Sequence, residues 1–461
     1  MPGMNILYIV TLLALACSKG GSPSPSPTPP PTQPGADSIP AQYGQPFTSV
    51  PAPADAVIYQ VNMRAFSTAG NLKAVQARLD SIRALGVNVL YLMPVYPVGV
   101  LKSVNSPYCV KDFQSVATEF GLLSDLRTLV DAAHSRGMAV LFDWVADHTS
   151  WDNGWIANKA WYQQDASGNI ISPPNTGWND VAALNYTNTD MRKAMIRAMS
   201  WWVYTANIDG YRFDAADFVP FDFWQQALDS LRRIPGHQLL FFAEGTRKDQ
   251  FTAGFQLEYG MGFYYTLKDQ VFHAGRSVKL IDSVNAVEYT NASPDLRVVR
   301  YTSNHDVDAS DGPPVDLFGG KTGSMSVFLV AAYMKGVPMI YDGQEVGCAV
   351  KLNYFNNSTP IDWSTNPDMT TEYKKILTFY NTSPTLRRGS LQSYSNDDIC
   401  VFTKTVGSSG VLVVANLRGT AGSYTVPADL QGSWTDAFDG SFQQVGSQLS
   451  LAPFQYKVFQ R

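Results

Sequence analysis

The chain has 461 residues, of which 45% are hydrophobic and 16% are charged, with 39 acidic and 34 basic side chains. This length and composition exclude a disordered chain and predict one large folded domain with a smaller appendage. The formal net charge of −5 creates no field that attracts a polyanion, so we expect no nucleic-acid partner.

The N-terminus has the pattern of a targeting signal. Residues 6–16 form a mostly apolar run that is too short to span a membrane and that leads to Cys17 in the letters ALAC. These letters resemble a bacterial lipobox, so residues 1–17 are interpreted as a lipoprotein signal with Cys17 as the lipidated residue. Residues 18–45 begin with a Ser/Pro tract and are interpreted as an extended spacer. We expect an extracytoplasmic protein whose only membrane attachment is this lipid. An ordinary secretory signal and a wrongly assigned start are the alternatives.

Eight apolar stretches that alternate with helical stretches predict the main domain. A strand that is buried on both faces of a parallel sheet is apolar along its whole length. The candidate strands are Val57–Phe66, Val87–Val95, Ala139–Val145, Ile208–Asp214, Leu239–Glu244, Phe255–Tyr259, Val298–Asn304 and Val337–Tyr341. Helices are predicted between them at Leu72–Leu85, Leu122–Arg136 and Thr189–Ala206. Eight such units predict an α/β fold, a (β/α)8 TIM barrel, over residues 46–388.

The pattern of the sequence changes near residue 389. Short stretches of alternating polar and apolar residues, separated by Gly and Ser turns, are typical of antiparallel strands. The clearest are Ile399–Thr405, Val411–Asn416 and Gln455–Phe459. Residues 389–461 are therefore predicted to form a small C-terminal antiparallel β-sandwich domain.

Three carboxylates stand at the ends of predicted strands: Asp214, Glu244 and Asp306. Because the carboxyl ends of barrel strands meet at one face, these side chains should share a cleft. Cleavage of a glycosidic bond needs two carboxyl groups, one ionised and one protonated. Arg212 lies two residues before Asp214, on the same side of the strand, and would keep Asp214 ionised as a nucleophile requires. The apolar run before Glu244 favours a protonated general acid.

The segments DWVADH, GYRFDAAD, FFAEG and TSNHD, in this order, resemble the four signature regions of the α-amylase family of glycoside hydrolases. The resemblance covers about residues 55–461. It implies that Asp214 is the nucleophile, Glu244 the acid/base and Asp306 the transition-state stabiliser. The substrate-binding residues that it implies are Tyr108, His148, Arg212 and His305. It further implies a retaining reaction through a covalent glycosyl intermediate, with the two catalytic carboxyls about 5 to 5.5 Å apart.

The resemblance implies a substrate with α-1,4-glucosidic bonds, such as starch-like polysaccharides or maltooligosaccharides, and no cofactor for the chemistry. A cyclomaltodextrinase or neopullulanase, an α-glucosidase and a glucan transferase remain open within the same chemistry. A surface starch-binding protein without activity is the alternative from another class. That alternative predicts the loss of a catalytic carboxylate, and all three are present in the sequence.

Three positions depart from the family pattern. Asp147 stands where many members have Asn, and Asp217 and Phe218 stand where many have Lys and His. Some of these members hold a structural calcium ion, which Asp147 would accept but for which Phe218 removes a partner. We therefore doubt the usual calcium site, and the sequence assigns no metal-binding residue. Asp143 is expected to pair with Arg212 beneath the site.

The insertion after the third strand, residues 149–185, is short compared with that of many relatives. It is expected to form a compact aromatic wall of the cleft. The aromatic residues are Trp151, Trp155, Tyr162 and Trp178.

Three further cysteines, Cys109, Cys348 and Cys400, leave at least one thiol unpaired within a monomer. Cys109 and Cys348 both fall near the predicted cleft mouth, so a disulfide between them is possible. No cysteine spacing suggests a zinc site or a cysteine nucleophile.

Overall fold

The computed structural model describes residues 39–356 and 359–461. The predicted signal segment with Cys17, and the spacer up to residue 38, lie outside the described residues. Residues 40–461 form one compact unit. Within the part of the chain that is described, helices are too short or too polar to cross a membrane.

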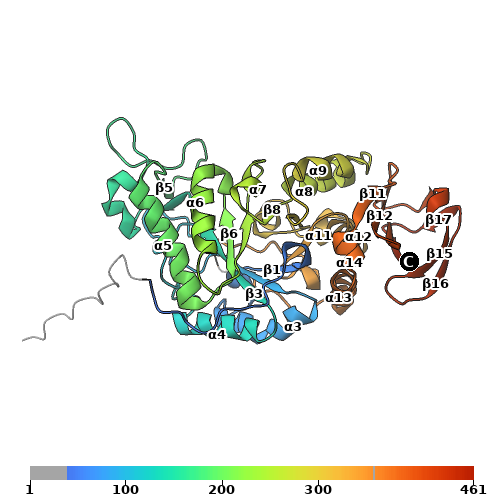
Figure 1. Cartoon of the computed structure of the whole chain (residues 1–461), viewed down its shortest axis with the longest axis horizontal. Coiled ribbons are helices and arrows are strands. Elements are labelled where there is room, and N and C mark those ends of the chain that lie inside the picture. Colours follow the sequence, from blue (N-terminus) through green and yellow to red (C-terminus); the bar gives the residue numbers. More distant parts are fainter. Residues whose placement is uncertain (1–38, 357–358) are drawn as a thin grey trace, which may run out of the picture. The chain divides into compact units, whose positions relative to one another are not determined.

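Eight parallel strands close into a barrel, which confirms the predicted fold class (Figure 1). Around the barrel the order is β1, β10, β9, β8, β7, β6, β3 and β2. In chain order the strands are β1 (Ile58–Val61), β2 (Val89–Leu92), β3 (Ala139–Val145), β6 (Gly210–Asp214), β7 (Leu240–Ala243), β8 (Leu257–Tyr259), β9 (Arg297–Arg300) and β10 (Val337–Tyr341). All eight correspond to predicted strands. They are buried almost throughout, because side chains fill the barrel on one face and helices cover the other.

The predicted first strand, Val57–Phe66, is too long. The strand ends at Val61, and Met63–Phe66 forms the short helix α1. Likewise, the helix predicted at Leu72–Leu85 is divided in two, because the backbone of Arg78 leaves the helical region with φ −106° and ψ 3°. Apolar spacing alone does not reveal either change.

Helices follow the barrel strands and form the outer layer. The longer ones are α4 (Leu123–His134), α5 (Thr189–Ala206), α6 (Phe221–Arg232), α9 (Leu280–Glu288), α12 (Gly320–Tyr333) and α13 (Pro367–Thr382). The shorter ones are α2 (Leu72–Ala77), α3 (Leu79–Ala84), α7 (Gln250–Ala253), α8 (Met261–Tyr265), α10 (His305–Ser310), α11 (Pro314–Leu317), α14 (Pro384–Arg388) and the π-helical η5 (Thr266–His273). The bounds of α5 agree with the prediction. Asn188 caps its first turn by accepting two backbone N–H groups at 3.0 Å, and Asn207 ends it in a left-handed conformation.

Short elements and loops stand at the carboxyl ends of the strands. The insertion after β3 contains β4 (His148–Ser150), η2 (Gly154–Ala157), η3 (Lys159–Trp161) and β5 (Val181–Ala183), with β4 and β5 paired antiparallel. The turn η4 (Ala216–Phe218) follows β6, and η6 (Gln344–Val346) follows β10. Small 3-10 turns also occur as η1 (Pro53–Asp55) and η7 (Ala428–Leu430).

The C-terminal part consists of antiparallel sheets, as predicted (Figure 1). Six strands pair in the order β11, β12, β13, β18, β15 and β16, and β14 pairs with β17. Their bounds are β11 (Ser390–Ser393), β12 (Ile399–Val406), β13 (Ser409–Asn416), β14 (Gly422–Thr425), β15 (Gly432–Asp436), β16 (Phe442–Val445), β17 (Gln448–Leu451) and β18 (Tyr456–Gln460). The predicted boundary after residue 388 falls between α14 and β11.

Cys109, Cys348 and Cys400 are free thiols in the described part of the chain. The possible disulfide between Cys109 and Cys348 is not formed. Instead, the Cys109 thiol donates to the carbonyl oxygen of Asp180 at 3.3 Å.

Candidate active site

Arg212 is the centre of a group of carboxylates at the carboxyl ends of the barrel strands. Its side chain is fully buried, and the register between β3 and β6 places Arg212 beside Asp143. Nη1 lies 2.6 Å from Asp143 Oδ1 and 2.8 Å from Asp214 Oδ1, while Nη2 lies 2.8 Å from Glu244 Oε1. One guanidinium thus holds three carboxylates from adjacent strands, and its pairing with Asp143 agrees with the prediction.

The environment of Asp214 is more complex than predicted. Burial raises the pKa of Asp214 well above its usual value, and the negative charges of Glu244 and Asp143 raise it further. Arg212 contacts the carboxylate and lowers its pKa, but does not cancel these effects. The contact follows from the spacing of two residues along a strand, whereas the desolvation depends on packing from several elements. The expectation that Arg212 keeps Asp214 ionised therefore left out burial and the two neighbouring carboxylates, which raise the pKa of Asp214.

Glu244 directly follows β7 and is held from two sides. Its Oε1 contacts Arg212, and its Oε2 accepts the backbone N–H of Ala215 at 2.8 Å. Its carbonyl oxygen accepts the N–H of Ala216, also at 2.8 Å. Ala215 adopts a left-handed conformation with φ 42°, which is uncommon for a residue with a side chain. The prediction gave Glu244 an apolar surrounding and missed that it shares the guanidinium with Asp214.

Asp306 lies in the first turn of α10, on the other side of the cleft. Asn304 caps this helix by accepting the N–H of Asp306 at 2.9 Å, which fixes the backbone there. The Asp306 side chain is 47% exposed, and the Tyr354 hydroxyl donates to its Oδ1 at 3.0 Å. Asp306 lines the same cleft as Asp214 and Glu244.

His305 and Tyr108 form the floor of the cleft. Burial, with a smaller effect of Arg212, lowers the pKa of His305 to about 4, so the ring is neutral near pH 7. The Gln60 amide donates to Nδ1 at 2.8 Å, so the proton is on Nε2, which donates to the Tyr108 hydroxyl at 2.7 Å. That hydroxyl in turn donates to Asp143 at 2.9 Å. The rings of Tyr108 and His305 also stack, 5.3 Å apart.

His148 lies at the end of the first signature region. Its Nδ1 is 2.9 Å from Asp147 Oδ2, and its Nε2 is 3.1 Å from the carbonyl oxygen of Tyr108. Burial opposes the charged ring, but Asp147 and the carbonyl outweigh it, so the pKa of His148 is raised above its usual value. With an acceptor at each nitrogen, the ring is held in a fixed orientation.

These side chains line one cleft of about 540 Å³. Asp214, Glu244, Asp306, Tyr108, His148 and His305 all line it, and Arg212 lies buried behind them. Residues that the sequence reasoning missed complete the wall from the loops after β2, β3 and β10: Val104, Asp180, Tyr354 and Phe355. No motif or periodic pattern in the sequence marks these four positions.

The predicted aromatic wall is correct for one of its four residues. Trp178 lines the cleft, 5.8 Å from the His148 ring. Tyr162 is buried, Trp155 packs against the core ring of Phe113 at 5.0 Å, and Trp151 lies under the Lys102 ammonium. Most of these rings therefore support the insertion rather than face a ligand.

The positions that depart from the family pattern provide few metal ligands. Asp147 has one buried oxygen, Oδ1, without a hydrogen-bond partner, while Phe218 has none to offer. Calcium takes six to eight oxygen ligands. Among the residues described, no three His, Cys, Asp or Glu side chains are grouped to hold a metal ion. The doubt about the usual calcium site stays a prediction.

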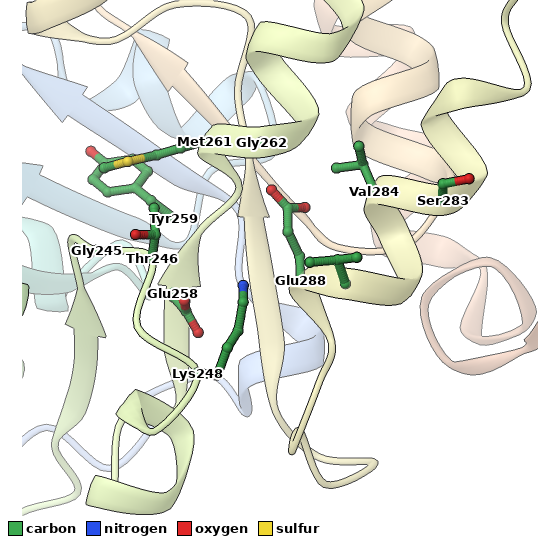
Figure 2. A pocket seen from close by; sticks show the side chains of 11 residues that line it. Gly245, Thr246, Lys248, Glu258, Tyr259, Met261, Gly262, Ser283, Val284 and Glu288 are labelled. Atoms are coloured by element: carbon green, nitrogen blue, oxygen red, sulfur yellow. The ribbon is translucent and has the colours of Figure 1, made fainter.

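A second cavity, of about 370 Å³, lies beside β8 and the loop after β7. Figure 2 shows the side chains that line it. Its wall includes Gly245 and Thr246, which directly follow Glu244. Glu258 also lines this cavity and is 4% exposed, and burial raises its pKa to about 8. The cavity therefore borders the segment that carries Glu244 but is lined by other residues than the cleft.

Known proteins with related sequences point to one family. A model of the alpha-amylase catalytic domain matches residues 49–172 and 175–377. "Alpha-amylase 2" of Dictyoglomus thermophilum is 24% identical over 422 residues, which cover 85% of this chain and 71% of the relative. A cyclomaltodextrin glucanotransferase of Geobacillus stearothermophilus is 27% identical over 403 residues, which cover 75% of this chain and 54% of that protein.

A solved structure shows the same fold. The crystal structure of an alpha-amylase from Lactobacillus plantarum superimposes with a TM-score of 0.80 at 24% identity, covering 88% of this chain and 99% of the other. The match to the catalytic-domain model extends over most of the chain and includes every carboxylate of the cleft. The chain therefore belongs to the alpha-amylase family of glycoside hydrolases.

Proposed function

We propose that this enzyme hydrolyses α-1,4-glucosidic bonds in starch-like α-glucans or maltooligosaccharides with retention of configuration. The observation that carries the proposal is the position of Asp214 and Glu244, each 2.8 Å from the same guanidinium. Two carboxyls held by one guanidinium are close together. A short distance between the two carboxyls, about 5 to 5.5 Å, is typical of enzymes that form a covalent intermediate. Enzymes that invert the configuration have a larger distance, which leaves room for a water molecule. The arrangement here favours the first class.

In the first step, Asp214 attacks the anomeric carbon while Glu244 gives its proton to the departing glycosidic oxygen. The bond to the leaving sugar breaks as the bond to Asp214 forms. In the second step, Glu244 takes a proton from a water molecule, whose oxygen displaces Asp214. Asp306, in the first turn of α10, stabilises the positive charge of the sugar ring in both transition states.

Four further residues position the carboxyls and the sugar in this scheme: Arg212, His148, His305 and Tyr108. Arg212 keeps both catalytic carboxyls in position, because its two amino groups contact one each. His305 and His148 line the cleft with rings whose nitrogens are held by protein partners, the first neutral and the second with a raised pKa. Tyr108 presents its ring to the sugar at the cleaved bond.

The same geometry serves several reactions of the family. The relatives named above include an amylase and a glucanotransferase, which differ in the molecule that accepts the glycosyl group. We favour water as the acceptor and keep cyclomaltodextrin hydrolysis, α-glucosidase action and glucan transfer as alternatives. A starch-binding protein without activity is disfavoured, because all three carboxylates are present and grouped.

The test is the release of reducing sugar from starch by the wild type and by Asp214→Asn. The variant should lose at least about 1,000-fold in kcat, as enzymes do when a nucleophile is removed. Asp229→Asn is the matched control, since Asp229 is 61% exposed and on α6; it should keep full activity. Equal activity of Asp214→Asn and wild type would refute the assignment, and amylose binding without any turnover by the wild type would support the binding protein.

We also propose an extracytoplasmic location, with Cys17 as the lipid anchor, and chemistry that requires no cofactor. The location rests on the apolar run, the letters ALAC and the Ser/Pro tract at the N-terminus. A radioactive fatty acid should label the wild type and fail to label Cys17→Ala. Label that persists in the variant would exclude Cys17 as the modified residue.

A further inference from the structure

The turn after β6 and the segment after Glu244 are joined by the carboxylate of Asp217. Its Oδ2 accepts the Thr246 N–H at 2.8 Å and the Thr246 hydroxyl at 3.1 Å. Its Oδ1 accepts the Arg247 N–H at 3.2 Å and the Gln250 amide at 2.6 Å. Both oxygens of Asp217 are therefore engaged by residues that follow Glu244 in sequence.

The contact between these two segments leaves no spare room. A Cβ atom on Gly245 would lie 2.3 Å from Asp217 Oδ1 and 2.1 Å from Gln250 Nε2. Such distances are far inside van der Waals contact, so a side chain at position 245 would have to displace the ends of the Asp217 and Gln250 side chains. Gln250, which supplies the shortest of the four hydrogen bonds, is fully buried. The carboxylate of Asp217 is thus held in a packed site.

The same two segments also hold Glu244 itself. Ala215 donates its N–H to Glu244 Oε2, and Ala216 donates to the Glu244 carbonyl oxygen, both at 2.8 Å. The next residue along the turn is Asp217, which binds the next residues of the opposite segment. The hydrogen bonds of Asp217 thus extend those that orient the Glu244 carboxyl.

We propose that Asp217 is a positioning residue for Glu244. By fixing the segment that follows Glu244 to the turn that follows Asp214, it sets the distance between the nucleophile and the proton donor. The inference rests on the proposed function, because it assumes that Glu244 gives its proton to the leaving group. Asp217 does not act as a ligand of the substrate, since its oxygens are already engaged by protein donors.

Phe218, the neighbour of Asp217, differs from it in its surroundings. Its side chain is 54% exposed, and its ring packs against that of Trp178 at 5.4 Å. Many family members have a Lys and a His at these two positions. This chain has Asp217, whose carboxylate binds the backbone after Glu244, and Phe218, whose ring is exposed.

The experiment compares two substrates that differ in their need for a proton donor. A maltooligosaccharide has a sugar as the leaving group and needs the proton, whereas a dinitrophenyl maltoside releases a phenolate that does not. Asp217→Ala should lose about 10- to 100-fold in kcat/KM on the maltooligosaccharide, the effect expected of a misplaced catalytic group. On the aryl maltoside it should lose less than about threefold, because Asp214 remains in place.

Asp217→Asn keeps an acceptor oxygen but loses the charge and one acceptor position, so it should fall between the wild type and Asp217→Ala. Asp229→Ala is the matched control. Asp229 is an exposed aspartate on α6 that lies 3.7 Å from Arg232 of the same helix. It should leave both substrates unaffected.

Two results for Asp217→Ala would overturn the inference: an equal loss of kcat/KM on both substrates, or no loss on the maltooligosaccharide. If Asp217→Ala does not fold, the same two results for Asp217→Asn decide. Glu244→Gln separates this failure from failure of the proposed function. If Glu244→Gln shows no preference for the aryl maltoside, its role as proton donor is wrong. If it shows the preference and the Asp217 variants do not, only the positioning role is wrong.

Discussion

At the scale of single residues, Arg212 joins three carboxylates into one electrostatic unit. Asp143, Asp214 and Glu244 each contact its guanidinium. A change in the charge of one carboxylate therefore changes the electrostatic potential at the others. Asp143 is fully buried and also accepts the Tyr91 hydroxyl at 2.6 Å, which holds it beneath the other two. The negative charges of Asp143 and Glu244 therefore act on the ionisation of Asp214, whose pKa they raise.

The first prediction concerns the acid limit of activity. Asp214 must be ionised to attack, and its pKa is raised, so kcat/KM should fall as the pH drops through a value above about 4, the usual pKa of aspartate. Glu244→Gln removes a negative charge that raises the pKa of Asp214, so the acid limb should move to lower pH. The measurement is a pH profile of kcat/KM on an aryl maltoside, which does not need Glu244 as proton donor. An acid limb that stays in place or moves to higher pH would contradict the coupling.

Sequence reasoning identified Asp214, Glu244 and Asp306 because strand ends of a barrel meet at one face, whatever the loops do. It did not find Tyr354, which donates to Asp306 from the loop after β10. The described residues 349–356 around Tyr354 form no helix or strand, so the place of Tyr354 over the cleft follows from tertiary contacts. Arg64 provides one of them by donating to the carbonyl oxygen of Tyr354 at 2.8 Å.

At the scale of elements, β6 carries Arg212 and Asp214, and its placement depends on Gly210 at its start. Gly210 has φ +143°, and a Cβ atom there would lie 2.0 Å from the carbonyl oxygen of Leu240 on β7. The clash is with backbone of a buried strand, which cannot turn away as a side chain can. The two strands therefore approach as closely as they do only because residue 210 has no side chain.

The second prediction follows from this close approach. Gly210→Ala should destabilise the protein by about 2–4 kcal/mol, because it adds both a steric clash and backbone strain. The midpoint of thermal unfolding should fall by at least about 3 °C. Gly154→Ala is the control, since nothing lies within 4 Å of a Cβ atom at that position, and its midpoint should stay within about 1 °C of the wild type. Similar midpoints for both variants would show that β6 and β7 can separate to accept a methyl group.

Elements were predictable where burial is uniform and less so where the chain changes direction. All eight barrel strands follow from apolar runs, since each is covered on both faces. The break at Arg78 and the helix at Met63–Phe66 follow no such pattern. They depend on how the connection after β1 packs over the barrel, which local sequence does not record.

At the scale of the whole molecule, the C-terminal sheet has two apolar faces. Phe402, Val413 and Val458 join the main core that contains the barrel, whereas Val401 and Val414 build a separate small core with other residues of the C-terminal sheets. The predicted β-sandwich accounts for the small core, whose second layer includes β14 and β17. The contact of the other face with the main core was not foreseeable, because alternation along a strand does not tell what covers each face.

Lys404 of β12 is a buried charge at this junction. Lys404 is only 4% exposed. Within the described residues, its ammonium group makes no hydrogen bond or ion pair. Burial lowers the pKa of Lys404 to about 7, and the positive charges of Arg297 and Lys335 add to this effect. Both neighbours belong to the barrel part, one at the start of β9 and one before β10.

The third prediction concerns Lys404→Met, which keeps the length of the side chain and removes the charge. The folded protein binds this proton below about pH 7 and the unfolded chain below about pH 10.4, so the unfolded state binds more protons between these values. The cost of the buried charge is therefore complete below pH 7 and fades as the pH rises toward 10. Lys404→Met should unfold at a higher temperature than the wild type at pH 6, by at least about 1 kcal/mol in stability, and this advantage should shrink steadily between pH 7 and 10. Lys374→Met, at an exposed position, should show no such trend. If Lys404→Met were less stable than the wild type at pH 6, the ammonium would have a stabilising partner, and the sign of this argument would be reversed.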